Sequence, residues 1–359
     1  MKKLDLYILK KFLGTFFFAI LLIISISIVF DMAEKIDDFL ESTVTLEMIV
    51  FDYYINFIPY FANLFTPMFV FIGVIFFTSK MAYRTEIIAI LSSGISFRRM
   101  LLPYFLGAGI VGVFSFVLGA YIIPPANKVR LDFENTYIKK RRETGLTNIH
   151  MEIEPETFVY VRRYSSLREV GDNFSLEKFE NKELKYKLSA RNATYDTATT
   201  GWNLKNWEKI DYLSAGRQLY TSGEEKDTIL NMEPSDFKEE RKFYETMTSP
   251  ELTRYIETQR KRGVGNVEEF LIEKYRRSAS PFSAFILTLI GVSLASRKVR
   301  GGMGLHIGIG LLLSFTYIFF MTLSTTFAIN GNMSPILAVW LPNIVFAVIA
   351  VTLYFRAPK

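Results

Sequence analysis

Six long apolar stretches constrain this chain more than any other feature of its sequence. Each has close to the ~20 residues that an α-helix needs to cross the hydrocarbon core of a bilayer. Hydrophobic residues make up 50% of the chain and charged residues 22%, a mixture that is hard to reconcile with one soluble core. Assigning the apolar stretches to the membrane resolves it: 12–30, 57–78, 101–123, 278–296, 305–328 and 336–355.

The first stretch has some features of a secretory signal, because lysines at positions 2, 3, 10 and 11 precede or open it. The residues that follow, Phe30-Asp31-Met32-Ala33-Glu34, offer no small-residue cleavage site, and five more stretches come after. We therefore expect a helix that stays in the membrane.

The cations near the spans are distributed unevenly. Lys and Arg cluster in the N-terminal segment, in the loops at 80–99 and 297–302, and in the C-terminal tail, whereas the two short loops on the other side hold only Lys35. Cytoplasmic loops carry this excess, so we expect both termini in the cytoplasm. The insert at 125–277 then lies on the far side, and the net charge of +6 reflects topology rather than a nucleic-acid patch.

The pattern of the insert changes from helical to strand-like between 147 and about 232. Apolar residues alternate with polar ones around Ile149, Phe158, Phe174 and Leu184, and a hairpin is expected with its turn at 199–201. Such spacing favours a sandwich, a jelly roll or a barrel.

A helical linker is expected after the strands, at about 249–277. It begins at Ser249-Pro250-Glu251, with Ser249 as the cap, and is interrupted at 263–265 by glycines. The expected domains are therefore 1–124 with three spans, 125–277 as the β domain and linker, and 278–359 with three more spans.

The loop at 80–99 joins the second and third spans. It carries Lys80, Arg84, Arg98 and Arg99 against one carboxylate, Glu86. This excess of cations places the loop in the cytoplasm.

Helical periodicity in the middle of this loop predicts a short amphipathic helix at about 80–96, with Gly94 ending it and Ser96 capping the next helix. The residues of its apolar stripe are Ile87, Ile88, Leu91 and Ile95. Such a helix either docks onto a soluble cytoplasmic partner or merely connects two spans.

Several motifs together resemble the lipopolysaccharide-export permeases LptF and LptG (the YjgP/YjgQ family). In the loop, Arg84-x-Glu86 is followed by small and apolar residues and then by Ser93-Gly94-Ile95-Ser96. The other matching positions are Pro59, Pro67, Pro124, Ser280-Pro281 and Trp340-Leu341-Pro342-Asn343. The resemblance covers nearly the whole chain, and its order and spacing carry more weight than any single motif.

The resemblance implies a mixed membrane protein with six transmembrane α-helices, three on each side of an extracytoplasmic β-jellyroll-like domain. In that family the chain is a permease subunit of an ABC transporter in the bacterial inner membrane. It extracts lipopolysaccharide and passes it to a periplasmic bridge. Its expected partners are an LptF/LptG-type second permease, an LptB-type ATPase dimer that binds the ATP, and an LptC-type jellyroll protein; no cofactor is expected in this chain.

The resemblance also implies roles for particular residues. The loop becomes the coupling helix, so the ATPase-coupling residues are expected to be Arg84, Glu86, Ile90, Gly94 and Ser96. The segments at 4–12 and 158–163 look more like LptG than LptF.

Lipid contacts are expected at the outer end of the first span and on two phenylalanine-rich spans. In the family, cations at this end face lipid phosphates, and here only Lys35 fits, among carboxylates that would make an interfacial charged collar instead. The expected acyl-chain contacts are Phe61, Phe65, Phe69, Phe315 and Phe319, for which packing or lipid exposure is the alternative.

We find no pattern for catalysis in the sequence. His150 and His306 are isolated, cysteine is absent and no P-loop motif occurs, so we expect a transporter subunit rather than an enzyme. The alternatives are a mechanotransmitting or lipoprotein-releasing permease of the FtsX/MacB kind, which has four spans, and a membrane-anchored enzyme or sensor.

Overall fold

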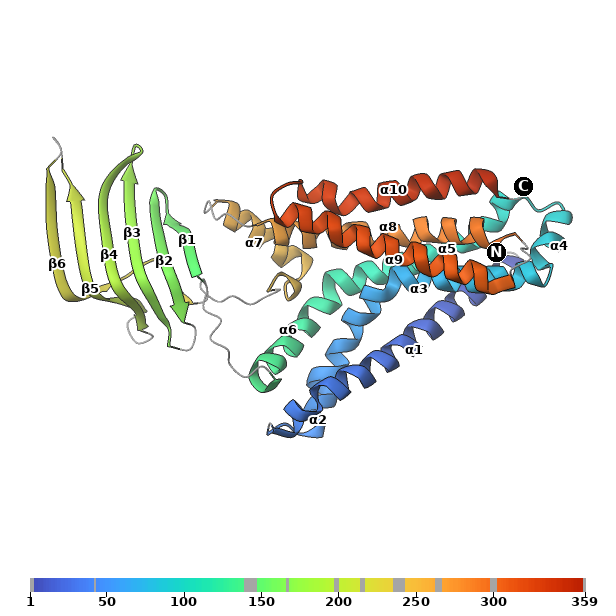
Figure 1. The fold of residues 1–359 in the computed structure, drawn as a ribbon, viewed down its shortest axis with the longest axis horizontal. Helices are drawn as coiled ribbons and strands as arrows, with labels where there is room; N and C mark the ends of the chain where they lie inside the picture. The colour runs from blue at the N-terminus through green and yellow to red at the C-terminus, as the bar shows by residue number, and fades with distance from the viewer. Residues whose placement is uncertain are drawn as a thin grey trace. The chain divides into compact units, whose positions relative to one another are not determined.

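The computed structural model describes residues 3–41, 43–138, 147–165, 168–196, 200–213, 217–234, 243–261, 267–297 and 302–357 (Figure 1). The chain forms two compact units. One comprises residues 1–138, 244–252 and 268–359, and the other 139–243 and 253–267. The predicted fold is confirmed: among the described residues, six helices are long and apolar enough to cross a membrane, and a β-sheet domain is inserted between the third and the fourth.

The first unit is a helical bundle. Its elements are α1 (Lys3–Glu41), α2 (Leu46–Met48), η1 (Ile49–Tyr54), α3 (Ile55–Tyr83), α4 (Glu86–Ser92), α5 (Phe97–Val117), η2 (Leu118–Ile122), α6 (Ile123–Phe133), η3 (Glu134–Ile138), α8 (Glu268–Ala295), α9 (Gly302–Ile329) and α10 (Pro335–Arg356). Both chain ends lie at the same end of this bundle as α4 (Figure 1), as an even number of spans requires.

The first three spans are much longer than the apolar stretches that predicted them. The first runs over Lys3–Leu40, 38 residues, or about 57 Å of helix against a hydrocarbon core of about 30 Å. The third continues without a break through Pro124 to Ile138. Prolines at 124 and 125 fall in the first turn of α6, where a missing backbone N–H is tolerated.

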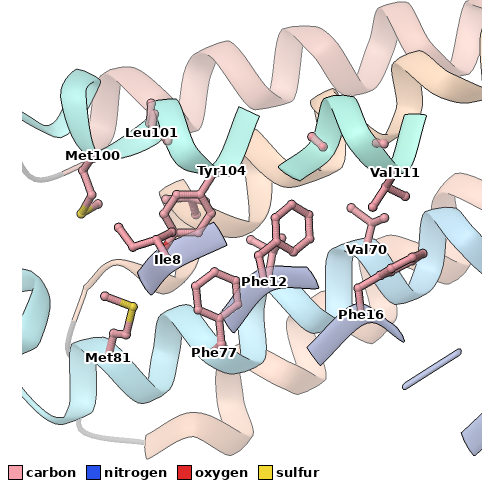
Figure 2. Packing of buried hydrophobic residues seen from close by; sticks show 14 of the residues in the cluster. Ile8, Phe12, Phe16, Val70, Phe77, Met81, Met100, Leu101, Tyr104 and Val111 are labelled. Atoms are coloured by element: carbon pink, nitrogen blue, oxygen red, sulfur yellow. The ribbon is translucent and has the colours of Figure 1, made fainter. Parts of the chain in front are cut away.

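The main core of the bundle forms where α1, α3 and α5 meet (Figure 2). Ile8, Phe12 and Phe16 follow one another at intervals of four and are at most 1% exposed, so they form a single stripe on α1. Phe77 of α3 lies between Phe12 and Tyr104 of α5, with ring centroids 6.1 and 5.2 Å away. The N-terminal part of α1, residues 3–16, is therefore held inside the bundle, and we call it the foot of α1.

Two of the motifs far apart in the sequence meet between α8 and α10. Pro281 lies inside α8 and has no N–H to donate. The Nδ2 of Asn343 donates to the carbonyl of Ala279 at 3.0 Å, and its Oδ1 accepts from the hydroxyl of Tyr317 at 2.9 Å. Polar groups in this apolar bundle are thus paired across helices, as a bilayer demands.

The second unit contains one antiparallel sheet in which consecutive strands are neighbours. The strands are β1 (Thr147–Glu154), β2 (Thr157–Ser165), β3 (Val170–Glu180), β4 (Glu183–Asp196), β5 (Gly201–Tyr212) and β6 (Gln218–Thr228). Alternate residues of one face are buried, including Val159, Phe174 and Leu204, and the Nε1 of Trp202 donates to the carbonyl of Met232 beyond β6.

Some local predictions differ from the structure. The domains were expected to change at 124/125 and 277/278, whereas the bundle unit extends to 138 and also includes 244–252 and 268–277. The helix α7 (Ser249–Lys261) begins at Ser249 itself. Its cap is not Ser249: the Glu251 carboxylate accepts from the N–H of Thr248 at 2.8 Å, as in a capping box. The predicted turn at 199–201 falls partly, and the break at 263–265 wholly, outside the described residues.

Candidate functional site

The short helix α4 projects from the end of the bundle between two tight turns. Thr85 precedes it with φ +63° and Gly94 follows it with φ +85°, both left-handed conformations. Ser96 then caps α5, accepting a hydrogen bond from the N–H of Arg99 at 3.4 Å. Gly94 and Ser96 therefore have the local roles that the sequence predicted for them, ending one helix and starting the next.

The five predicted coupling residues do not all point outward. Arg84, Gly94 and Ser96 are exposed, Glu86 is half-buried, and Ile90 packs against the bundle core. The predicted apolar stripe is wrong at Ile88, which is 52% exposed. The buried side of α4 is formed instead by Ile87, Ile90 and Leu91, because a helix repeats every 3.6 residues and i+1 turns away from the core.

The outward surface of this segment is small and mostly uncharged. We call it the docking face; its exposed residues are Tyr83, Arg84, Thr85, Ile88, Ala89, Ser92, Ser93 and Gly94. Its one charged side chain is that of Arg84, and its large apolar side chains are those of Tyr83 and Ile88.

Two of the spans, those of α1 and α9, are the least covered by the rest of the described residues. In the most apolar window of α1 and of α9 only 22% is buried, against 56% in α8. The two helices flank α3, which packs against both. Large apolar side chains are exposed along both helices; Phe30 of α1 is 73% exposed and Leu312 of α9 is 67% exposed. Lipid or a further protein would cover these faces.

The predicted acyl-chain residues fall into two groups. On α3, Phe61, Phe65 and Phe69 are half-buried and form a ladder, with successive ring centroids 6.2 and 6.4 Å apart. On α9, Phe315 and Phe319 are 61% and 64% exposed. No ring contact joins the two groups within the part of the chain that the structure describes, so the structure does not gather them into one site.

Lys35, near the C-terminal end of α1, is not a free cation. Its ammonium donates to Asp31 at 2.7 Å and to the hydroxyl of Tyr53, and lies 3.9 Å from the carboxylate of Glu134. Tyr53 and Tyr54 also donate to Asp31, at 3.2 and 3.3 Å. Lys35 thereby ties α1 to η1 and η3.

The same polar network continues towards the α8 side of the bundle. Arg130 donates to Glu134 at 2.9 Å and to Asn127 at 3.4 Å, and Asn127 donates to Glu245 at 3.5 Å. Arg277 of α8 donates to the backbone carbonyls of Tyr244 and Met247 and to the Glu273 carboxylate. The two segments of the bundle unit that flank the β domain in sequence are therefore both fixed within this unit.

The sequence reasoning missed most of this network and also the contacts beneath α4. The pair of the buried Asp5 with the partly exposed Arg99 was missed because the lysines around Asp5 suggested only a topology signal. A signal did exist: Arg130 and Glu134 are four residues apart in a helix, the spacing at which opposite charges meet.

The structure gives no metal centre among the residues it describes: no three His, Asp or Glu side chains there are grouped to hold an ion. His306 contacts Ser79 through Nδ1 at 3.0 Å, and His150 lies against the ring of Tyr160. His150 also borders a hollow of about 1100 Å³ on the sheet, with a mixed polar and apolar lining.

These features define a class of protein. The chain is a multi-pass membrane protein with three spans on each side of an inserted β domain, two poorly covered spans and a short helix projecting between the second and third spans.

The family can then be stated. Residues 6–356 match the family described as lipopolysaccharide export system permease LptF/LptG, and the chain belongs to that family. It is therefore a permease-type subunit of the bacterial inner membrane. No curated protein matches the chain in a search of such proteins.

Proposed function

We propose that this chain is one of two permease subunits of an ABC transporter that extracts lipopolysaccharide from the inner membrane for export to the outer membrane. The observation that carries the proposal is the family match, which spans residues 6–356 and so includes the bundle, the projecting helix and the β domain. The division of three spans and three also differs from the four-span arrangement of the FtsX/MacB-like alternative.

An external energy source is required for this task. Removing a lipid with several acyl chains from a bilayer costs about 0.8 kcal/mol for each CH₂ group exposed to water. We infer that a separate LptB-type ATPase dimer binds the docking face and supplies this energy. Of the proposed contacts, Arg84 and Glu86 offer opposite charges and Ile88 offers exposed apolar area.

The poorly covered faces of α1 and α9 suit the lateral boundaries of a cavity shared with a second, LptF/LptG-type permease. In this arrangement α3, packed between the two helices, supplies one wall, and the ladder of Phe61, Phe65 and Phe69 contacts acyl chains. The β domain, placed in the periplasm by the positive-inside reasoning, hands the lipid to an LptC-type jellyroll protein. We assign the chain to the LptG-type subunit from segments 4–12 and 158–163.

A pull-down tests the whole proposal. The tagged chain is recovered in mild detergent from its native membrane, and the proteins and lipids that accompany it are identified by mass spectrometry. Recovery of a second six-span permease, a P-loop ATPase and lipopolysaccharide is expected. Recovery of the chain with no ATPase refutes the proposed function.

Glu86, which is half-buried beside the docking face, has its own test. Glu86→Lys reverses a charge at the start of α4 and should weaken ATPase recovery, whereas Glu47→Lys, an exposed glutamate in α2, should not. Equal recovery of the ATPase with both variants would exclude the docking role of Glu86.

A further inference from the structure

Two hydrogen-bonded contacts join the foot of α1 to the segment that carries the docking face. The Asp5 carboxylate is buried and accepts from both terminal nitrogens of Arg99, each at 2.7 Å. Two residues further along α1, the Tyr7 hydroxyl donates to Oε2 of Glu86 at 3.0 Å. The foot of α1 is thus bonded to the first turn of α4 and to the first turn of α5.

Apolar packing lies directly behind these bonds. Ile8 and Phe12 of α1 belong to the same buried cluster as Met100 of α5 (Figure 2). Ile87 of α4 is also a member of this cluster. The foot of α1, the docking helix and the start of α5 therefore share one core.

The two kinds of contact differ in what they fix. Van der Waals packing drives the association of helices in a bilayer, and the apolar stripe of α1 supplies such packing without any directional bond. A bidentate arginine–carboxylate pair has a defined direction and spacing, and being charge-assisted it is among the strongest hydrogen bonds in proteins. The bonds at the foot therefore set the position of α1 relative to α4.

We propose that Asp5, Tyr7 and Arg99 form a clamp through which a displacement of α4 moves α1. This inference rests on the proposed function in one respect, that an ATPase docks on α4. The clamp residues are positioning residues: they contact neither ATP nor lipid, and they pass motion from the docking face to one of the two least covered spans.

A distance measurement in the assembled transporter tests the clamp. The chain contains no cysteine, so two introduced cysteines can be spin-labelled without background. Suitable sites are Phe30→Cys on α1 and Val348→Cys on α10, whose native side chains are 73% and 63% exposed. The label distance is measured in lipid nanodiscs with and without a non-hydrolysable ATP analogue, and lipid transported per ATP hydrolysed is measured in parallel.

In the unmodified background the nucleotide should shift the distance. With Asp5→Asn and Tyr7→Phe combined, the nucleotide-dependent change in label distance should fall at least twofold. The lipid transported per ATP hydrolysed should also fall, while the amount of bound ATPase is unchanged. Asp5→Glu, which keeps a carboxylate, should restore most of the shift, and Tyr121→Phe, an exposed tyrosine of η2, should leave it intact.

The outcomes separate the clamp from the proposed function. A full shift in the combined variant, or no nucleotide-dependent shift in an unmodified chain that binds ATPase, overturns the clamp. Loss of ATPase binding in the combined variant also overturns it, because the residues would then serve docking alone. Failure of the unmodified chain to bind any ATPase refutes the proposed function instead.

Discussion

Lys35 has two possible roles: it stabilises the bundle through Asp31, or it binds a lipid phosphate. Substitutions of Lys35 and Asp31 separate these roles. If Lys35 serves the bundle, then Lys35→Met leaves the Asp31 carboxylate without its cation. Adding Asp31→Asn removes the stranded charge, so the double variant should recover most of the lost stability. If Lys35 binds lipid phosphate, the double variant should stay defective in lipid contact.

The size of the effect follows from the surroundings of the pair. Removing one partner of a fully buried ion pair costs about 3–5 kcal/mol. Here the side chains of Lys35 and Asp31 are 20% and 14% exposed, so water screens part of the charge. Asp31 also keeps its hydrogen bonds from Tyr53 and Tyr54. We therefore expect about 2 kcal/mol for Lys35→Met and less than about 1 kcal/mol for the double variant.

Two assays decide between the roles. Thermal unfolding in detergent measures stability, where about 2 kcal/mol corresponds to a drop of about 4–8 °C for a unit of this size. A photo-crosslinking residue at Val29, which is 67% exposed on α1, reports contact with lipopolysaccharide. The structural reasoning is refuted if the double variant is as unstable as Lys35→Met. It is also refuted if crosslinking falls equally in both variants while stability is unchanged.

Three further substitutions test other parts of the structure. Gly94→Ala should lower the free energy of unfolding by about 1–2 kcal/mol and reduce ATPase recovery. The reason is the φ of +85° at Gly94, since nothing lies near the added methyl group. The control Gly304→Ala in α9 should be neutral or stabilising in the same thermal assay. Asn343→Leu should lower bundle stability by about 1–2 kcal/mol in the same assay, since it removes the hydrogen bond to the Ala279 carbonyl and takes the Asn343 acceptor away from the buried Tyr317 hydroxyl. Burial raises the pKa of the Tyr164 hydroxyl, and Glu169 adds to this. The folded state thus loses stability as pH rises above about 10, so Tyr164→Phe should flatten that alkaline decline in a series of denaturation midpoints.

The sequence predicted the spans and the β domain well because both depend on patterns that repeat along the chain. Hydrocarbon thickness demands about 20 apolar residues, and a half-buried strand demands alternation, so 305–328 and the strands from Thr147 onward could be found without knowing their neighbours. The ends of the helices were predicted less accurately than the spans themselves. The α1 helix extends well past its apolar stretch because polar residues at the interface continue a helix without altering its hydropathy signal.

The candidate site was predicted less completely, because it depends on contacts between distant residues. Arg84 and Gly94 could be placed from local turn chemistry, but nothing near Asp5 in sequence indicates Arg99, 94 residues away. For the same reason the sequence left Lys35 open between a lipid contact and a charged collar: its partner Asp31 is one turn earlier, but Tyr53 and Glu134 come from other helices. Counting cations predicts on which side of the membrane a loop lies, but it does not predict the residue with which a charged side chain pairs.

The ion pairs described in the bundle unit lie in two layers, and their spacing supports the membrane placement independently of hydropathy. On α1, Asp5 belongs to one layer and Asp31 to the other. Their separation of 26 positions corresponds to about 39 Å of helix, more than the hydrocarbon core of about 30 Å. The stretch 12–30 contains no charged residue, so both layers can reach the interfacial regions while the apolar part of α1 crosses the hydrocarbon. Directional bonds therefore join α1 to other elements of the bundle in both layers.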